Sequence, residues 1–178
     1  MSSESRTRIL SGALDLLREG QSISLESAAQ RAGLTKPGLM YHFRTKEALM
    51  VALVDHVIDR WERALMAAAG ASVSELTAGA RIRAYADFSL STDFDESDVV
   101  MLADPRLRAT LSARWEERVA PWVAIPSDTS STTRGRLVAV RLLADGVWFA
   151  SATDVLDPDA SDRELVRAVV DDLLGGSE

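Results

Sequence analysis

Apolar residues recur along this chain at intervals of three and four, the period of an amphipathic α-helix. The first such stripe comprises Ile9, Leu10, Ala13, Leu14 and Leu17. Another begins at Leu49 and continues to about Ala69, which predicts one long helix there. No segment shows a convincing β-strand pattern. The hydrophobic pattern therefore predicts an all-α fold of about nine helices.

Residues 22–49 contain the start and stop signals of two short helices joined by a tight turn, followed by a third helix. Ser24 can cap a helix over residues 25–32. Gly33 follows this helix at the position where a left-handed residue is needed, a conformation that glycine adopts with the least strain. Thr35 can cap the second helix, in which Pro37 is tolerated because first-turn amides have no intrahelical acceptor. Thr45 can cap the third. This is the layout of a helix-turn-helix module.

The middle helix of this module has two different faces. Leu34, Leu39 and Phe43 can pack against the small residues of the preceding helix. The opposite face carries Lys36, Gly38, Met40, Tyr41 and His42. A helix start with small side chains lets the backbone approach a phosphate, and its free amides favour an anion. We predict that this face contacts DNA; the alternative is a three-helix packing unit whose polar face is merely solvated.

Four segments occur in a characteristic order between Arg6 and Leu53: RTRILSGALDLL, SLESAAQRAGL, LTKPGLMYHF and TKEAL. In this order they resemble the N-terminal domain of the TetR family of bacterial transcriptional regulators. The resemblance covers roughly the first 50 of 178 residues. It implies that five residues lie in or beside the major groove of DNA: Lys36, Pro37, Gly38, Tyr41 and His42. It also implies phosphate contacts from Ser24, Ser27, Thr35 and Lys46.

A family of this kind implies a ligand-responsive transcriptional regulator, most often a repressor. It would bind a palindromic operator as a homodimer and be released by a small-molecule effector. Residues 1–48 would form the DNA-binding domain, and residues 49–178 would bind the effector and dimerise. The alternative is a small helical ligand-binding or protein-interaction protein that does not act on DNA.

Further helices are predicted in the remainder of the chain. They cover residues 74–91, the segment from Asp104 to Pro121, the segment from about Thr133 to Leu156, and a last segment ending at Gly175. The acidic stretch STDFDESD, residues 91–98, reads as a solvated turn or loop.

The helix around residues 137–152 is apolar on nearly all sides, so contact with one neighbour cannot bury it. One stripe contains Leu137, Val140, Ala144 and Val147, and another contains Val138, Leu142, Phe149 and Ala152. Together with the last helix, this pattern predicts a four-helix dimer contact. The predicted interface residues are Leu137, Arg141, Asp145, Gly146, Phe149, Val166 and Val170. A central core helix in a monomer is the alternative.

Aromatic and methionine side chains on several predicted helices indicate an effector pocket for a largely apolar or aromatic molecule. The predicted lining residues are Trp61, Tyr85, Phe88, Met101, Trp115 and Trp148. For each of them, plain core packing is the alternative.

Charge and composition exclude several classes of function and of functional site. Residues 1–50 hold seven basic and five acidic residues, whereas the rest holds 13 basic and 22 acidic, within a net charge of −7. Phosphate affinity must therefore come from local placement of cations. The lack of cysteine excludes disulfides and thiol catalysis. No nucleophile and base are paired, no cofactor or metal site is recognisable, and no run of about 20 apolar residues occurs. We expect a cytoplasmic protein that is not an enzyme.

Overall fold

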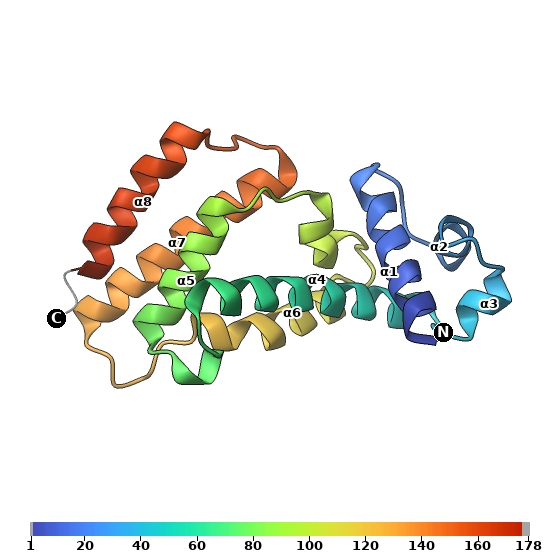
Figure 1. Ribbon diagram of the computed structural model, residues 1–178, viewed down its shortest axis with the longest axis horizontal. Coiled ribbons are helices and arrows are strands. Elements are labelled where there is room, and N and C mark those ends of the chain that lie inside the picture. Colours follow the sequence, from blue (N-terminus) through green and yellow to red (C-terminus); the bar gives the residue numbers. More distant parts are fainter. Residues whose placement is uncertain (1, 176–178) are drawn as a thin grey trace. The chain divides into compact units, whose positions relative to one another are not determined.

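The computed structural model describes residues 2–175, in which the chain forms eight α-helices, two 3-10 helices and no β-strand (Figure 1). The first four are α1 (Ser2–Arg18), α2 (Leu25–Arg31), α3 (Lys36–Met40) and α4 (Lys46–Ala69). They are followed by η1 (Val73–Glu75), α5 (Ala78–Ser91), η2 (Glu96–Leu102), α6 (Arg108–Val123), α7 (Ser131–Thr153) and α8 (Ala160–Gly175). The all-α prediction is confirmed.

The contacts of the chain group it into two compact units. The first contains residues up to Asp59 together with Asp95–Arg118, and the second contains Arg60–Phe94 and the chain from Val119 onwards. The sequence predicted a division after residue 48. The contacts instead place η2 and most of α6 with the N-terminal helices, because η2 packs against α1 and side chains of α6 pair with α4.

The first unit contains the predicted three-helix module with the predicted caps. The Ser24 hydroxyl accepts a hydrogen bond from the Ser27 amide at 2.9 Å, and the Ser27 hydroxyl accepts one from the Ser24 amide at 2.9 Å. Gly33 has φ +66°, the left-handed conformation expected where α2 ends. The Thr45 hydroxyl accepts from the Ala48 amide at the start of α4. Each of these contacts joins residues that are close in sequence.

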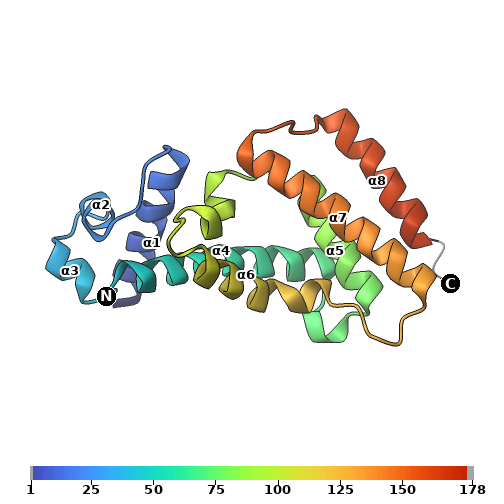
Figure 2. The same ribbon diagram turned by 180° about the vertical axis from the view of Figure 1, so that it is seen from behind.

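The second unit is built around α5, which packs against α7 and α8 (Figure 2). Its buried residues include Ile82 on α5, Val140 and Ala144 on α7, and Val170 on α8. Two ion pairs also join α8 to α5: Arg83 pairs with Asp171, and Arg167 pairs with Asp87.

The acidic stretch at residues 91–98 is not the solvated loop that the sequence predicted. Asp95 caps η2, accepting a hydrogen bond from the Ser97 amide at 2.8 Å, while Asp98 accepts one from the Asp95 amide. Ser97 and Asp98 are buried. The acidic side chains accept hydrogen bonds from backbone amides at the start of η2, so this part of the segment can be buried instead of solvated.

Three predicted helix ends also differ from the structure. The helix expected from residue 74 begins at Ala78, because the Thr77 hydroxyl caps it. Asp104 caps a turn through the Arg106 amide, and α6 begins only at Arg108. α7 ends at Thr153 rather than near Leu156, because Asp154 adopts φ +54°. Among the described residues, none of the helices combines the length and apolarity needed to cross a bilayer.

Candidate nucleic-acid interface

The exposed face of α3 consists of the side chains that the sequence predicted for it. Tyr41, directly after α3, is 82% exposed and Met40 is 39% exposed, whereas Leu39 is fully buried. Lys36 extends from the first position of α3 with 54% of its side chain exposed. Burial of Leu39 fixes the rotation of the helix, so the polar residues on the opposite side face solvent.

The start of α3 is held by its cap. The Thr35 hydroxyl accepts a hydrogen bond from the Gly38 amide at 3.2 Å. A Cβ atom added at Gly38 would lie 3.2 Å from the Thr35 hydroxyl oxygen, which is closer than ordinary van der Waals contact. Pro37 lies between them, exposed and within the first turn. The small residue at position 38 therefore protects the cap and adds no side chain of its own to this end of the helix.

Two further residues predicted to contact the groove lie next to each other after α3. The rings of Tyr41 and His42 meet edge to face, with their centroids 5.4 Å apart. Tyr41 is the more exposed of the two, since His42 is half-buried. The tyrosine hydroxyl is thus available to an external partner.

The cations of this unit have different surroundings. Arg31 makes a two-pronged contact with Glu19, and the Arg6 guanidinium lies 5.2 Å from the centre of the Phe43 ring. Lys36 lies 4.0 Å from a carboxylate oxygen of Glu26, at the limit of an ion pair. In a solvated pair of this kind the attraction is small.

Lys46 has a closer partner that the sequence did not reveal. Its ammonium nitrogen lies 2.5 Å from a carboxylate oxygen of Asp104. This hydrogen bond, together with one from the Arg106 amide, lowers the pKa of Asp104 below its ordinary value. A residue predicted to hold DNA phosphate is therefore paired with a carboxylate of its own chain.

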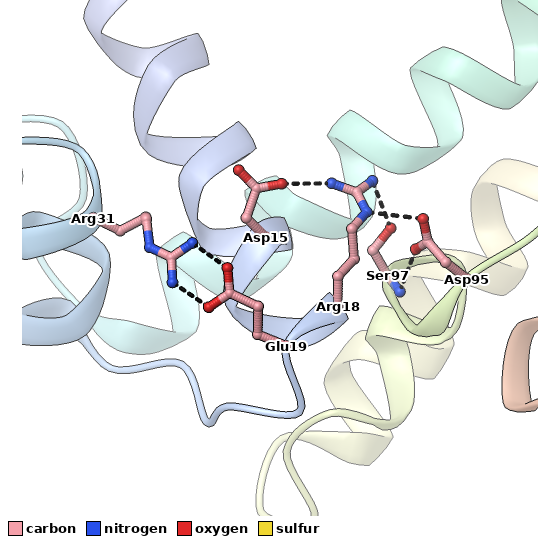
Figure 3. Close-up of polar contacts among 6 residues, drawn as sticks. All are labelled: Asp15, Arg18, Glu19, Arg31, Asp95 and Ser97. Carbon is pink, nitrogen blue, oxygen red and sulfur yellow. Dashed lines mark hydrogen bonds and ion pairs between the residues drawn. The ribbon is translucent and has the colours of Figure 1, made fainter.

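A second polar network joins α1 to η2 (Figure 3). Arg18 donates to Asp95 at 2.8 Å, to Ser97 at 3.1 Å and to Asp15 at 2.8 Å. Burial acts to raise the pKa of Asp95, but the hydrogen bonds from Ser97 and Arg18 outweigh it, so the pKa is lowered. Arg18 and Asp95 are 77 positions apart, and no local pattern could have indicated the contact.

The lowered pKa of Asp95 predicts how its ion pair responds to acid. A carboxylate whose folded pKa lies below its unfolded pKa stabilises the fold above the unfolded pKa, and the effect is lost as pH falls through the folded value. Asp95→Asn should therefore lower the free energy of unfolding at pH 7, by less than about 1 kcal/mol because the pair is partly solvated. The difference from wild type should shrink below about pH 4, near the ordinary aspartate pKa. Urea unfolding at several pH values measures it, and a difference that is constant with pH would contradict the prediction.

Two charged residues of α4 pair with α6 within the same unit. Asp55 accepts hydrogen bonds from Arg114 at 2.8 Å and from Arg118 at 3.0 Å, and Arg118 also reaches Asp59 at 2.7 Å. With the Arg18 network, these pairs attach both ends of the segment Asp95–Arg118 to α1 and α4.

Three of the six predicted effector-site residues form an aromatic cluster in the second unit. The Trp61 ring centre lies 5.2 Å from that of Phe88 and 5.3 Å from that of Trp148. Phe94, which the sequence did not single out, completes the cluster at 5.4 Å from both Trp61 and Phe88. These spacings are those of direct ring contact. The rings therefore pack on one another between α4, α5 and α7.

The other three predicted effector-site residues are Tyr85, Met101 and Trp115. The Tyr85 hydroxyl donates to Asp145 at 2.9 Å, and burial, followed by the charge of Asp145, raises the tyrosine pKa. Met101 and Trp115 belong to the first unit, where both are buried. Helical periodicity cannot show which helices share a core, so the predicted set combined residues of two units.

The predicted dimer residues also separate into two groups. Leu137 and Val170 are buried inside the chain, and Asp145 bonds to Tyr85 as well as pairing with Arg141 at 3.4 Å. Neither apolar residue is available to a partner, because each already packs in the core of its own chain. Val166 is half-buried, while Phe149 is 47% exposed.

The apolar residues that α7 and α8 leave exposed form two short stripes. On α7, Leu142 is 55% exposed and is followed at helical spacing by Gly146 and Phe149. On α8, Leu165 and Val169 are 68% and 48% exposed, one turn apart. A Cβ atom at Gly146 would meet nothing within 4 Å. Of the predicted interface residues, Gly146 and Phe149 lie on this exposed surface.

Within the described residues, no cluster of three or more histidine, cysteine, aspartate or glutamate side chains is arranged to hold a metal ion. The polar networks described above consist of ion pairs, helix caps and the Tyr85–Asp145 hydrogen bond. The candidate nucleic-acid interface is the exposed surface of α3 and its flanking caps.

Comparisons with known proteins show which family the chain resembles. Residues 79–175 match the family model described as tetracyclin repressor-like, C-terminal domain. The chain is 38% identical over 61 residues to the HTH-type transcriptional regulator RutR of Escherichia coli (strain K12), and to RutR of Shigella flexneri. That match covers 33% of this chain and 29% of the length of these relatives.

A solved structure extends the similarity to nearly the whole chain. It is a member of the TetR family from Streptomyces coelicolor A3, with a TM-score of 0.62 and 27% sequence identity. The similarity covers 96% of this chain and 98% of that one. The family model alone spans more than half of the 178 residues. The chain therefore belongs to the TetR family of transcriptional regulators.

Proposed function

We propose that this protein is a DNA-binding transcriptional regulator, acting as a homodimer on a palindromic operator and released by a small-molecule effector. The observation that carries the proposal is α3, whose polar face is exposed over a buried Leu39. Family membership supports a regulator and not an enzyme, in agreement with the expectation from the sequence. Such a protein would work in the cytoplasm, where it meets its operator.

The proposed DNA contacts divide into positioning and reading contacts. Tyr41, Lys36 and the small start of α3 at Pro37 and Gly38 would enter or border the major groove, with His42 beside them. The capping residues Ser24, Ser27 and Thr35 would contact phosphates. Their hydroxyls accept hydrogen bonds from amides. The Ser24 hydroxyl also donates to the Ser27 hydroxyl, and the Ser27 hydroxyl donates to the carbonyl oxygens of Ser22 and Ser24. On DNA binding, a phosphate oxygen would replace these internal acceptors.

The proposed dimer uses the exposed stripes of α7 and α8. An interface needs an apolar centre, and Leu142, Phe149, Leu165 and Val169 supply apolar side chains that the chain itself leaves uncovered. Gly146 lies between the first two, where the absence of a side chain allows a second helix to approach closely. A two-fold dimer of this kind would present two copies of α3 to half-sites roughly 34–36 Å apart on a palindrome.

The proposed effector site lies at the aromatic cluster of the second unit. Trp61, Phe88, Phe94 and Trp148 offer an apolar, aromatic surface, and the nearby Tyr85–Asp145 hydrogen bond offers a polar group. An aromatic or apolar effector would have to separate rings that now touch. Such a ligand releases DNA only by the difference of its affinities for the two states, typically about 1–3 kcal/mol.

Selection of genomic DNA by the purified protein tests the regulator proposal. We expect a few fragments to be retained, to share an approximate palindrome, and to be lost steeply as salt increases. Retention of no fragment, or equal retention of all fragments, would contradict a sequence-specific operator.

Tyr41→Ala tests the reading face. Because Tyr41 is 82% exposed, the variant should unfold within about 0.5 kcal/mol of the wild type. Affinity for the selected fragment should fall by about 1–3 kcal/mol, the usual value of a groove contact. Gel-shift titration with the selected fragment and a scrambled one gives both affinities. A variant with unchanged preference between the two fragments would remove Tyr41 from the reading face.

A further inference from the structure

Asp104 presents a carboxylate to the residue that is predicted to hold DNA phosphate. It follows η2, and only 11% of its side chain is exposed. One oxygen lies 2.5 Å from the Lys46 ammonium nitrogen, and the other accepts a hydrogen bond from the Arg106 amide at 2.9 Å. The second bond fixes the carboxylate within its own turn. Its orientation towards Lys46 therefore does not depend on Lys46 alone.

Lys46 remains accessible while it is paired. It is the first residue of α4, and 42% of its side chain is exposed. A lysine ammonium is a compact point charge with three donors on a flexible stem, so it can exchange one anionic acceptor for another. A carboxylate and a phosphate are acceptors of the same kind, each forming short charge-assisted hydrogen bonds.

The segment that carries Asp104 is also attached elsewhere. Arg18 holds the start of η2 through Asp95 and Ser97, and Arg114 holds α6 through Asp55. If the Lys46–Asp104 ion pair broke, the turn between η2 and α6 would still be held at both ends. Loss of the Lys46 contact is thus a local exchange and does not require η2 or α6 to leave the unit.

We propose that Asp104 competes with DNA phosphate for Lys46, so that the Asp104 carboxylate lowers the DNA affinity of the free protein and is released when DNA binds. The inference rests on the proposed DNA-binding function. By thermodynamic linkage, DNA binding and the conformation of the Asp104 turn influence each other equally. In this proposal, DNA affinity can be adjusted by substitutions in the turn between η2 and α6, without replacing a residue that contacts DNA.

Asp104→Asn is the direct test, because asparagine keeps an acceptor for the Arg106 amide and removes the charge. We expect it to bind a duplex retained in the genomic selection about two- to fivefold more tightly than wild type, the range of a partly exposed ion pair. Glu96→Gln is the matched control. It removes the same charge from an exposed position of η2 and should change affinity much less.

The Lys46→Ala background separates competition from a general charge effect. In that background, Asp104→Asn should leave DNA affinity unchanged, since no ammonium remains to be released. The proposal is overturned if Asp104→Asn gains no more than Glu96→Gln, or if its gain persists without Lys46. Failure of the wild type itself to retain any fragment would instead reject the DNA-binding function, and this inference with it.

A second measurement guards against misfolding. Circular dichroism should show wild-type helicity for Asp104→Asn. If that variant has lost helicity, Asp104→Ser is used in its place, because serine also offers a capping oxygen. Acetic anhydride labelling followed by mass spectrometry measures the accessibility of the Lys46 amine in the absence of DNA. Labelling of Lys46 should rise in the Asp104 variant and stay at the wild-type level in Glu96→Gln. Equal Lys46 labelling in all three proteins would show that Asp104 does not occupy the amine, against the proposal.

Discussion

Gly146→Arg is expected to convert the proposed dimer into monomers that no longer hold the proposed palindromic operator. Position 146 lies between the exposed Leu142 and Phe149, so arginine would place bulk and charge at the centre of the proposed contact. Loss of the second reading helix should weaken operator binding by about 10²–10⁴-fold, the usual gain from linking two binding modules. Sedimentation velocity and gel-shift titration measure the two effects.

The isolated chain should tolerate this arginine. A Cβ atom at position 146 meets nothing within 4 Å, and replacing a helical glycine raises helix propensity. Gly135→Arg is the matched control, because Gly135 is an exposed glycine of α7 with equally open surroundings, outside the predicted interface. It should remain dimeric. Sedimentation of the wild type as a monomer at micromolar concentration would reject the α7–α8 interface.

Trp61→Ala is expected to cause the largest loss of stability. Trp61 is 2% exposed and its ring contacts Phe88, Phe94 and Trp148. Removing the indole deletes this buried area and leaves a cavity, which should lower the free energy of unfolding by about 3–5 kcal/mol. Trp61→Phe should cost less because it keeps an aromatic ring. Denaturant unfolding gives both values, and a loss below about 1 kcal/mol for alanine would show that the cluster is loosely packed.

Binding of indole can distinguish a closed core from an effector pocket at this aromatic cluster. If the rings are a closed core, indole should raise the melting temperature of Trp61→Ala, where it can fill the cavity, and leave the wild type unchanged. If the cluster opens to aromatic ligands, indole should also stabilise the wild type. The second outcome supports the proposed effector site, and the first outcome excludes it for a molecule of this size.

The sequence determined the helices of the DNA-binding module because their signals are local. The caps at Ser24, Thr35 and Thr45 each bond an amide three residues away, and Gly33 adopts the left-handed conformation that its position after α2 required. The apolar residue Leu39 then fixes which face of α3 is exposed. Order and spacing of these parts were sufficient to identify the family.

The tertiary structure decided which apolar stripe of α7 faces the core and which residues meet across the chain. The stripe with Leu137 and Val140 is buried, whereas Leu142 and Phe149 are exposed. Periodicity gives the stripes but not their neighbours. Likewise, Arg18 pairs with Asp95, which is 77 positions away in the sequence, and Lys46 pairs with Asp104 in the turn before α6. A charge carries no signal of its partner in the linear sequence, because pairing depends on where folding brings the two side chains.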